Sequence, residues 1–166
     1  QKILIEEYDK LMNSKIYKIL ISQGKGAMIK HIQHGTYGFE DLIMSNHYYL
    51  TNFDLWILAN KFKAPIVFIS STKLIENQTD LFATMTGPTV IFIRSSGIRP
   101  DRIPKYRMIV SNNNEFIIPI SLLSSSLQDR LESSTPVPIA TFVSTFQPSK
   151  KKLVVQSEKR KLKIEE

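Results

Sequence analysis

Histidines are the residues in this sequence best able to hold a metal ion. His31 and His34 lie three positions apart, so on a helix they would share one face, as paired metal ligands do. Zinc needs three or four protein ligands, and no cysteine lies nearby to complete the set. Glu40 and Asp41 follow closely, but carboxylates on a helix usually face solvent. The spacing therefore predicts no metal site, and we expect no cofactor.

Sequence motifs for a catalytic nucleophile or a nucleotide are missing. The 166 residues contain no cysteine, which excludes disulfides, thiolate metal sites and a cysteine nucleophile from this chain. No Gly-x-Ser-x-Gly turn or P-loop occurs. The turn Gln23-Gly24-Lys25-Gly26 lacks the further glycines and the preceding strand of a nucleotide-binding loop. A Ser–His–Asp site stays open, because its members meet in space rather than in sequence.

Basic residues gather in the segment 93–107, which connects two predicted strands. Two prolines and one glycine make this connection rigid, and arginine suits bidentate contacts with phosphate or carboxylate groups. The cations, set against a single aspartate, are Arg94, Arg99, Arg102, Lys105 and Arg107. The segment is interpreted either as a solvated loop or as a surface that binds an anion or a protein partner.

The C-terminal stretch 149–166 carries most of the net charge. Of the formal net charge of +7, this stretch supplies +4 and residues 1–148 supply +3. Its cations are Lys150, Lys151, Lys152, Lys159, Arg160, Lys161 and Lys163. Lysine-rich ends bind nucleic acid without sequence preference, chiefly through counterion release. They also serve as solubilising arms or localisation signals, and the sequence favours neither.

Helical spacing of apolar residues indicates the elements that would position these side chains. It predicts helices over residues 3–22, 26–33, 39–44, 51–62 and 120–132. Gly24 and Gly26 are expected to break the first of them. The clearest helix begins after Thr51, a predicted N-cap with Asp54 three residues on. Trp56 lies in this helix, which is apolar on nearly every face and is therefore expected in the core.

Branched apolar runs predict strands over residues 66–70, 90–94, 106–110 and 115–118. The Asn112-Asn113-Asn114 turn is expected to join the last two strands as a hairpin. From Ser133 onward, prolines punctuate a Ser/Thr-rich stretch that is typical of a linker. We therefore predict an α/β (α+β) domain over residues 1–132, with a small mixed or antiparallel sheet packed by helices. A linker and a disordered basic tail would occupy residues 133–166.

Three consecutive segments carry a resemblance to a known family. They are a short helix, an aromatic turn with a buried helix, and a strand, at residues 39–44, 48–59 and 64–69. Their order resembles the later half of the ovarian tumour (OTU) type of cysteine protease domain. In that family a hairpin follows, whose second strand begins with His-Tyr. Residues 88–94 and 105–109 would form it here, so the resemblance covers roughly residues 39–110.

The resemblance implies that the catalytic residues of the family are replaced. The family's nucleophile lies in an Asp-Gly-x-Cys turn that opens a helix. The nearest match is Gly24-Lys25-Gly26-Ala27, which has Ala27 in place of the cysteine. The family's histidine falls at Lys105, and an ammonium group cannot act as the imidazole base that generates the thiolate. The resemblance thus implies a non-catalytic domain that binds a protein partner, such as a ubiquitin-like protein.

The Lys-, Ile- and Asn-rich composition is similar to that of the OTU-like domains of giant DNA viruses, so we expect an intracellular protein of the host cytoplasm or the virion. The chain begins at Gln1 rather than at Met, and we expect it to be a piece of a larger viral protein. No apolar run approaches the ~20 residues of a membrane span, and no membrane partner is expected. Two other functions stay open: a nucleic-acid-associated component of a viral replication, transcription or packaging machine, and a ubiquitin hydrolase whose nucleophile comes from outside this chain.

Overall fold

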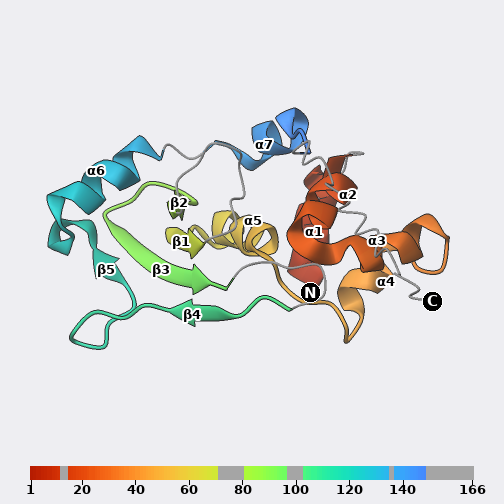
Figure 1. The fold of residues 1–166 in the computed structure, drawn as a ribbon, viewed down its shortest axis with the longest axis horizontal. Coiled ribbons are helices and arrows are strands. Elements are labelled where there is room, and N and C mark those ends of the chain that lie inside the picture. Colours follow the sequence, from red (N-terminus) through yellow and green to blue (C-terminus); the bar gives the residue numbers. More distant parts are fainter. Residues whose placement is uncertain (12–14, 71–80, 97–102, 135–136, 149–166) are drawn as a thin grey trace, which may run out of the picture.

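An α/β fold, with helices packed on a small mixed sheet, is formed by residues 1–11, 15–70, 81–96, 103–134 and 137–148, which the computed structural model describes (Figure 1). The α-helices are α1 (Lys2–Leu11), α2 (Lys15–Leu20), α3 (Gly26–Gln33), α4 (Phe39–Met44), α5 (Asn52–Phe62), α6 (Ser125–Ser133) and α7 (Ile139–Thr145). A π-helical turn (Ile21–Lys25) joins α2 to α3, and a 3-10 turn (Ile120–Leu122) precedes α6. The strands are β1 (Ile66–Ser70), β2 (Leu81–Ala83), β3 (Thr89–Ser95), β4 (Tyr106–Met108) and β5 (Ile118–Pro119).

The parallel strands β1 and β3 form the centre of the sheet. The strand order is β2-β1-β3-β4, and β5 also pairs with β3. Successive side chains of a strand point to opposite faces. Ile66 and Phe68 pack in the core that contains α5, whereas Val67 and Ile69 pack in a second core with Leu131 of α6. Helices thus cover both faces of the central strands, which is why β1 is a continuous apolar run rather than an alternating one.

Strands β4 and β5 lie one after the other along the same edge of β3, and the predicted hairpin between them is wrong. Each pairs with β3 in the antiparallel sense, β4 at the end of β3 and β5 at its start. The turn at 112–114 is present, closed by a hydrogen bond of 2.8 Å from the Ser111 N–H to the Glu115 carbonyl. It is an excursion in one interrupted strand (Figure 1), because asparagine-rich sequence specifies a turn but not which strands pair across it.

Helix α5 is the central helix of the larger core, and its predicted cap is confirmed. The Thr51 N–H donates to Oδ2 of Asp54 at 2.7 Å, which is the return half of a capping box. Trp56 is fully buried, as expected, but Phe62 at the end of the helix is 61% exposed. Lys63 then adopts a left-handed conformation with φ 54°, and this residue ends the helix.

The helix predicted over residues 3–22 is divided. Helix α1 ends at Leu11, residues 12–14 lie outside the described part of the chain, and α2 begins at Lys15. Gly24 breaks the helix as expected, with φ 89°. Gly26 does not, because its φ of −58° is helical and it opens α3. One residue in the left-handed region is enough to redirect the chain.

The segment from Ser133 to residue 148 is not simply a linker, which corrects the predicted domain boundary at residue 132. Helix α6 ends at Ser133, and α7 follows and lies beside α2 (Figure 1). Phe142 and Val143 of α7 are buried, and the Phe142 ring lies 5.1 Å from that of Trp56. The surrounding prolines and serines obscured this short apolar pattern. The predicted disordered tail, 149–166, lies outside the described residues.

The last predicted helix, over residues 120–132, is a 3-10 turn followed by α6. The hydroxyl of Ser124 accepts a hydrogen bond from the Leu127 N–H and caps α6. Of the helices in the described ranges, none is long and apolar enough to cross a membrane.

Candidate functional site

A buried ion pair joins the π-helical turn to the start of α5. The side chains of Lys25 and Asp54 are both fully buried, and Nζ lies 2.5 Å from Oδ2. Oδ1 of Asp54 accepts hydrogen bonds from the hydroxyls of Tyr8 and Tyr48, each at 2.6 Å. Thr51 donates to Oδ2 through its N–H and its hydroxyl, both at 2.7 Å. Five donor groups therefore converge on one carboxylate.

The conformation of Gly24 directs the following lysine into this cluster. Its carbonyl accepts a hydrogen bond of 2.9 Å from the hydroxyl of Tyr49, which fixes the turn against the chain that leads to α5. The Lys25 ammonium donates to the hydroxyl of Tyr48 at 2.7 Å and lies 3.9 Å from the centre of the same ring. The ring face adds an attraction for the cation.

The environment of the cluster shifts the pKa of each member. Burial opposes the ionisation of Asp54, but the charge of Lys25 and the hydrogen bonds outweigh it and hold the pKa of Asp54 below its usual value. Burial lowers the pKa of Lys25, and Asp54 offsets part of this effect. Burial raises the pKa of both Tyr8 and Tyr48, and the negative charge of Asp54 adds to it. A perturbed pKa can mark a catalytic group, but the Lys25–Asp54 pair is sealed from solvent and has a structural role.

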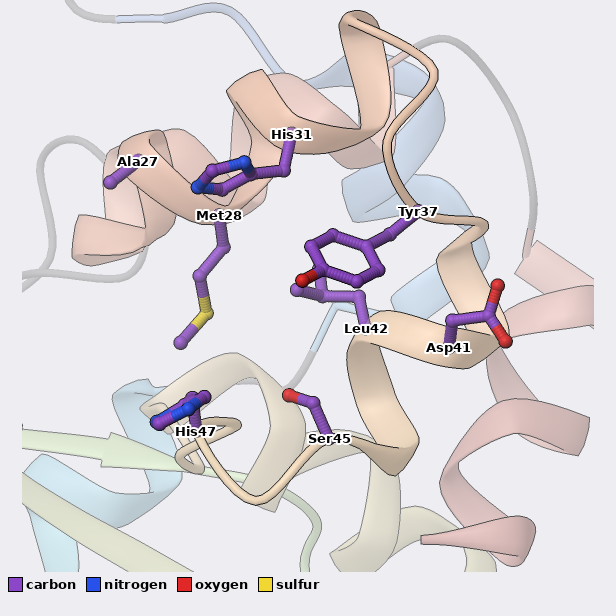
Figure 2. Close-up of a pocket in the computed structure, with 8 residues that line it drawn as sticks. All are labelled: Ala27, Met28, His31, Tyr37, Asp41, Leu42, Ser45 and His47. Atoms are coloured by element: carbon purple, nitrogen blue, oxygen red, sulfur yellow. The ribbon is translucent and has the colours of Figure 1, made fainter.

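A pocket of about 270 Å³ opens between α3 and the connection from α4 to α5 (Figure 2). Three short segments build it, because the turn after α3 brings α4 back alongside. Its lining residues are Ala27, Met28, His31, Tyr37, Asp41, Leu42, Ser45 and His47. The pocket therefore begins at the position that the OTU resemblance assigns to the nucleophile.

Apolar side chains form the floor of the pocket and polar groups form its rim. Figure 2 shows the Met28 side chain and the Ser45 hydroxyl directed into the space, whereas the carboxylate of Asp41 points away. Asp41 instead accepts a hydrogen bond of 3.0 Å from the Gly38 N–H, at the start of α4. Within the described residues, no hydrogen bond involves the side chains of His31, Tyr37, Ser45 and His47. These groups are free to meet a ligand.

The two positions that would be catalytic in the OTU family both lie at the surface. Ala27 is exposed on the rim of the pocket, and Lys105 is exposed immediately before β4 and does not line it. The strand after Lys105 pairs with β3. The hydroxyl of Tyr106 donates to the Leu50 carbonyl at 3.3 Å, so β4 begins beside the segment that holds Tyr49.

Two of the predicted basic residues are neighbours across the strands. Arg94 of β3 lies directly opposite Arg107 of β4, so both side chains share one face of the sheet. Both are exposed, and within the described residues neither forms an ion pair. Arg99, Arg102 and the seven cations of the tail lie outside the described part of the chain.

The structure places His31 and His47 in the lining of the pocket and His34 at the end of α3. The ring of His31 lies 5.8 Å from that of Tyr37. No group of three or more His, Cys, Asp or Glu side chains among the described residues could hold a metal ion. Sequence reasoning missed the Lys25–Asp54 pair, because a contact across 29 residues leaves no local signal.

Comparison of the chain with family models, with curated proteins and with solved structures finds no match. Small-molecule pockets are typically about 300–1,000 Å³. At about 270 Å³, this pocket suits one anchoring side chain of a partner better than a cofactor of nucleotide size.

Proposed function

We propose that this chain is a non-catalytic, OTU-like domain of a larger viral protein, and that it binds a protein partner through the pocket beside Ala27. The observation that carries the proposal is the pocket itself, with an apolar floor under polar groups that have no partner in the described fold. Such a site receives an anchoring side chain, and the polar rim fixes its orientation.

The absence of a catalytic role is supported by the chemistry of the cluster and the rim. Ala27 offers a methyl group where a hydrolase of the family needs a thiolate. The groups with the most perturbed pKa, in the Lys25–Asp54 cluster, are saturated with hydrogen bonds and closed to a substrate. The polar groups of the pocket thus serve recognition.

Ubiquitin is the first partner to test. We expect titration of unlabelled ubiquitin into the isotopically labelled chain to shift the backbone amides of Met28, His31 and Ser45. Ala27→Trp fills the pocket and should weaken binding by at least about tenfold, which corresponds to loss of one anchoring contact. Lys30→Trp is the matched control, because it places the same ring at an exposed position of α3 outside the pocket.

Two results would contradict the proposal. Release of the fluorophore from a fluorogenic ubiquitin amide by the purified chain would show that it is a hydrolase. Equal binding by Ala27→Trp and Lys30→Trp would remove the pocket from recognition. No amide shift at about 1 mM ubiquitin would exclude ubiquitin as the partner.

A second candidate function, binding of nucleic acid, is favoured by Arg94 and Arg107, which are exposed and form no ion pair with any described residue. Like charges directly opposite each other on two strands destabilise a sheet, and a phosphate would relieve this. Binding of a short labelled DNA across a salt series tests it, since each phosphate contact contributes about 0.9 to the slope of log K against log salt. The variant Arg94→Thr/Arg107→Thr should reduce the slope. An unchanged slope would leave the basic tail, or no site at all, to explain binding.

A further inference from the structure

Among the described residues, strand β4 is an edge of the sheet, and part of its backbone has no partner there. The Ser96 N–H donates to the Lys105 carbonyl at 2.9 Å, and the Ile109 N–H donates to the Phe92 carbonyl at 3.0 Å. In an antiparallel ladder the hydrogen-bonded residues alternate with residues whose N–H and C=O groups point away. Tyr106 and Met108 therefore direct their backbone groups outward. An exposed edge of this kind is a template for another strand.

Apolar side chains are exposed along and beside this edge. Met108, the last residue of β4, is 54% exposed, and Val110, two residues further on, is 49% exposed. Between β4 and β5, the residues Ile109, Phe116 and Ile117 are also apolar and exposed. Exposed apolar residues clustered at a sheet edge are typical of a binding surface or of an aggregation site. The charged residues around β4 indicate which of these two interpretations applies.

The cations near the edge select what can pair with it. Lys105 and Arg107 alternate with Tyr106 and Met108 along the strand, and Arg94 lies opposite Arg107. No carboxylate in the described ranges forms an ion pair with any of them. A second copy of this chain would bring the same cations together and is disfavoured. The basic tail carries the same charge, so it is an equally poor occupant.

We infer that β4 is a docking edge for an extended segment of a partner protein in which acidic residues alternate with apolar ones. The segment adds a strand beside β4 and pairs with the outward N–H and C=O groups of Tyr106 and Met108. Its acidic side chains lie on the face of Lys105 and Arg107. Its apolar side chains lie on the opposite face, with Met108. This inference does not depend on the pocket beside Ala27, and either can fail alone.

The test uses the full chain and a short end-capped peptide that alternates Glu and Val. Fluorescence anisotropy should show binding of this peptide and none of the matched peptide that alternates Lys and Val. Hydrogen exchange, followed by nuclear magnetic resonance, should show that the amides of Tyr106 and Met108 gain protection when the peptide is bound. Protection at these outward amides is the signature of strand addition, which contact by side chains alone would not produce.

Two variants separate binding from folding. Arg107→Glu faces Arg94 across the strands and should not destabilise the fold, because it replaces a like-charge pair with an opposite one. It should nevertheless weaken binding of the acidic peptide by about tenfold or more. Met108→Pro removes an outward N–H without removing a bond to β3, and it should abolish binding. Lys18→Glu makes the same kind of charge change at an exposed position of α2 and should bind like the unaltered chain.

Several outcomes would overturn the inference. They are equal binding of the acidic and basic peptides, no binding of the acidic peptide at about 1 mM, and binding without protection of the outward amides. If DNA displaces the peptide and binds the chain more tightly than the peptide does at the same salt concentration, the edge would be assigned to nucleic acid instead. A dimer that forms through β4, detected by sedimentation, would assign it to a second copy. None of these outcomes changes the result of the ubiquitin titration, which tests the pocket beside Ala27 separately.

Discussion

Replacement of Asp54 by Asn should cost this fold more stability than replacement of Lys25 by Met. Asp54→Asn removes the carboxylate that pairs with the buried ammonium of Lys25. It also replaces one acceptor oxygen with an amide N–H that faces other donors. Removing one partner of a buried ion pair costs about 3–5 kcal/mol, so we expect a loss of about 4 kcal/mol. Lys25→Met leaves the carboxylate with four of its five donor groups, and the loss should be about 2 kcal/mol.

The double variant tests the same reasoning more sharply. Once Lys25 is Met, the amide of Asn at position 54 no longer faces a buried charge. The double loss should therefore be about 2 kcal/mol smaller than the sum of the single losses. Urea unfolding can be followed by the fluorescence of Trp56, which is the single tryptophan of the chain and is fully buried. This account of the cluster would be refuted if the two single variants lost equal stability and the double variant lost the sum of the two. The comparison requires that the slope of the unfolding free energy against urea concentration is the same for all variants.

Three other changes address pH, the backbone and the last helix. The pKa of Asp54 is held low in the folded state, so its contribution to the free energy of unfolding should be complete above about pH 4 and lost as the pH falls below it. Burial raises the pKa of Tyr8, so the contribution of Tyr8 should be complete below about pH 10 and fall above it. Urea unfolding across pH measures both contributions. An acid limb that persists unchanged in Asp54→Asn would contradict this assignment. Gly24→Ala, at φ 89°, should cost about 1 kcal/mol in thermal unfolding, while Gly87→Ala, whose added Cβ meets only ordinary contacts, should cost almost nothing. Phe142→Ala should cost about 4 kcal/mol in urea unfolding, and a loss near zero would return α7 to the status of a linker.

Local features of the fold were predictable because local sequence determines them. The cap of α5 requires only Thr51 and a carboxylate three residues later. Strand β1 is a run of apolar, mostly branched residues that follows Pro65, and the structure contains it at the predicted residues. The presence of a turn at 112–114 was also predictable, since asparagine tolerates turn conformations.

Features that depend on pairing between distant segments were not predictable. The choice of β3 as the partner of both β4 and β5 is set by packing, and the turn between them is equally compatible with a hairpin. Helix α7 is too short and too rich in Thr and Ser neighbours to be recognised without the surface that it covers. His31 and Ser45 line the same pocket only because α4 folds back along α3.

The position of α7 has a consequence for synthesis of the chain. Phe142 and Val143 complete a core that also contains Leu4 and Tyr8, and Lys15 donates to the Ser144 carbonyl across 129 residues. During translation, the first helices therefore emerge long before the segment that covers them. Contacts between residues so far apart in sequence form late, and they lower the rate of folding. We expect the nascent chain to expose Trp56 and its aromatic neighbours until α7 leaves the ribosome, and a chaperone that binds apolar segments would act during this interval.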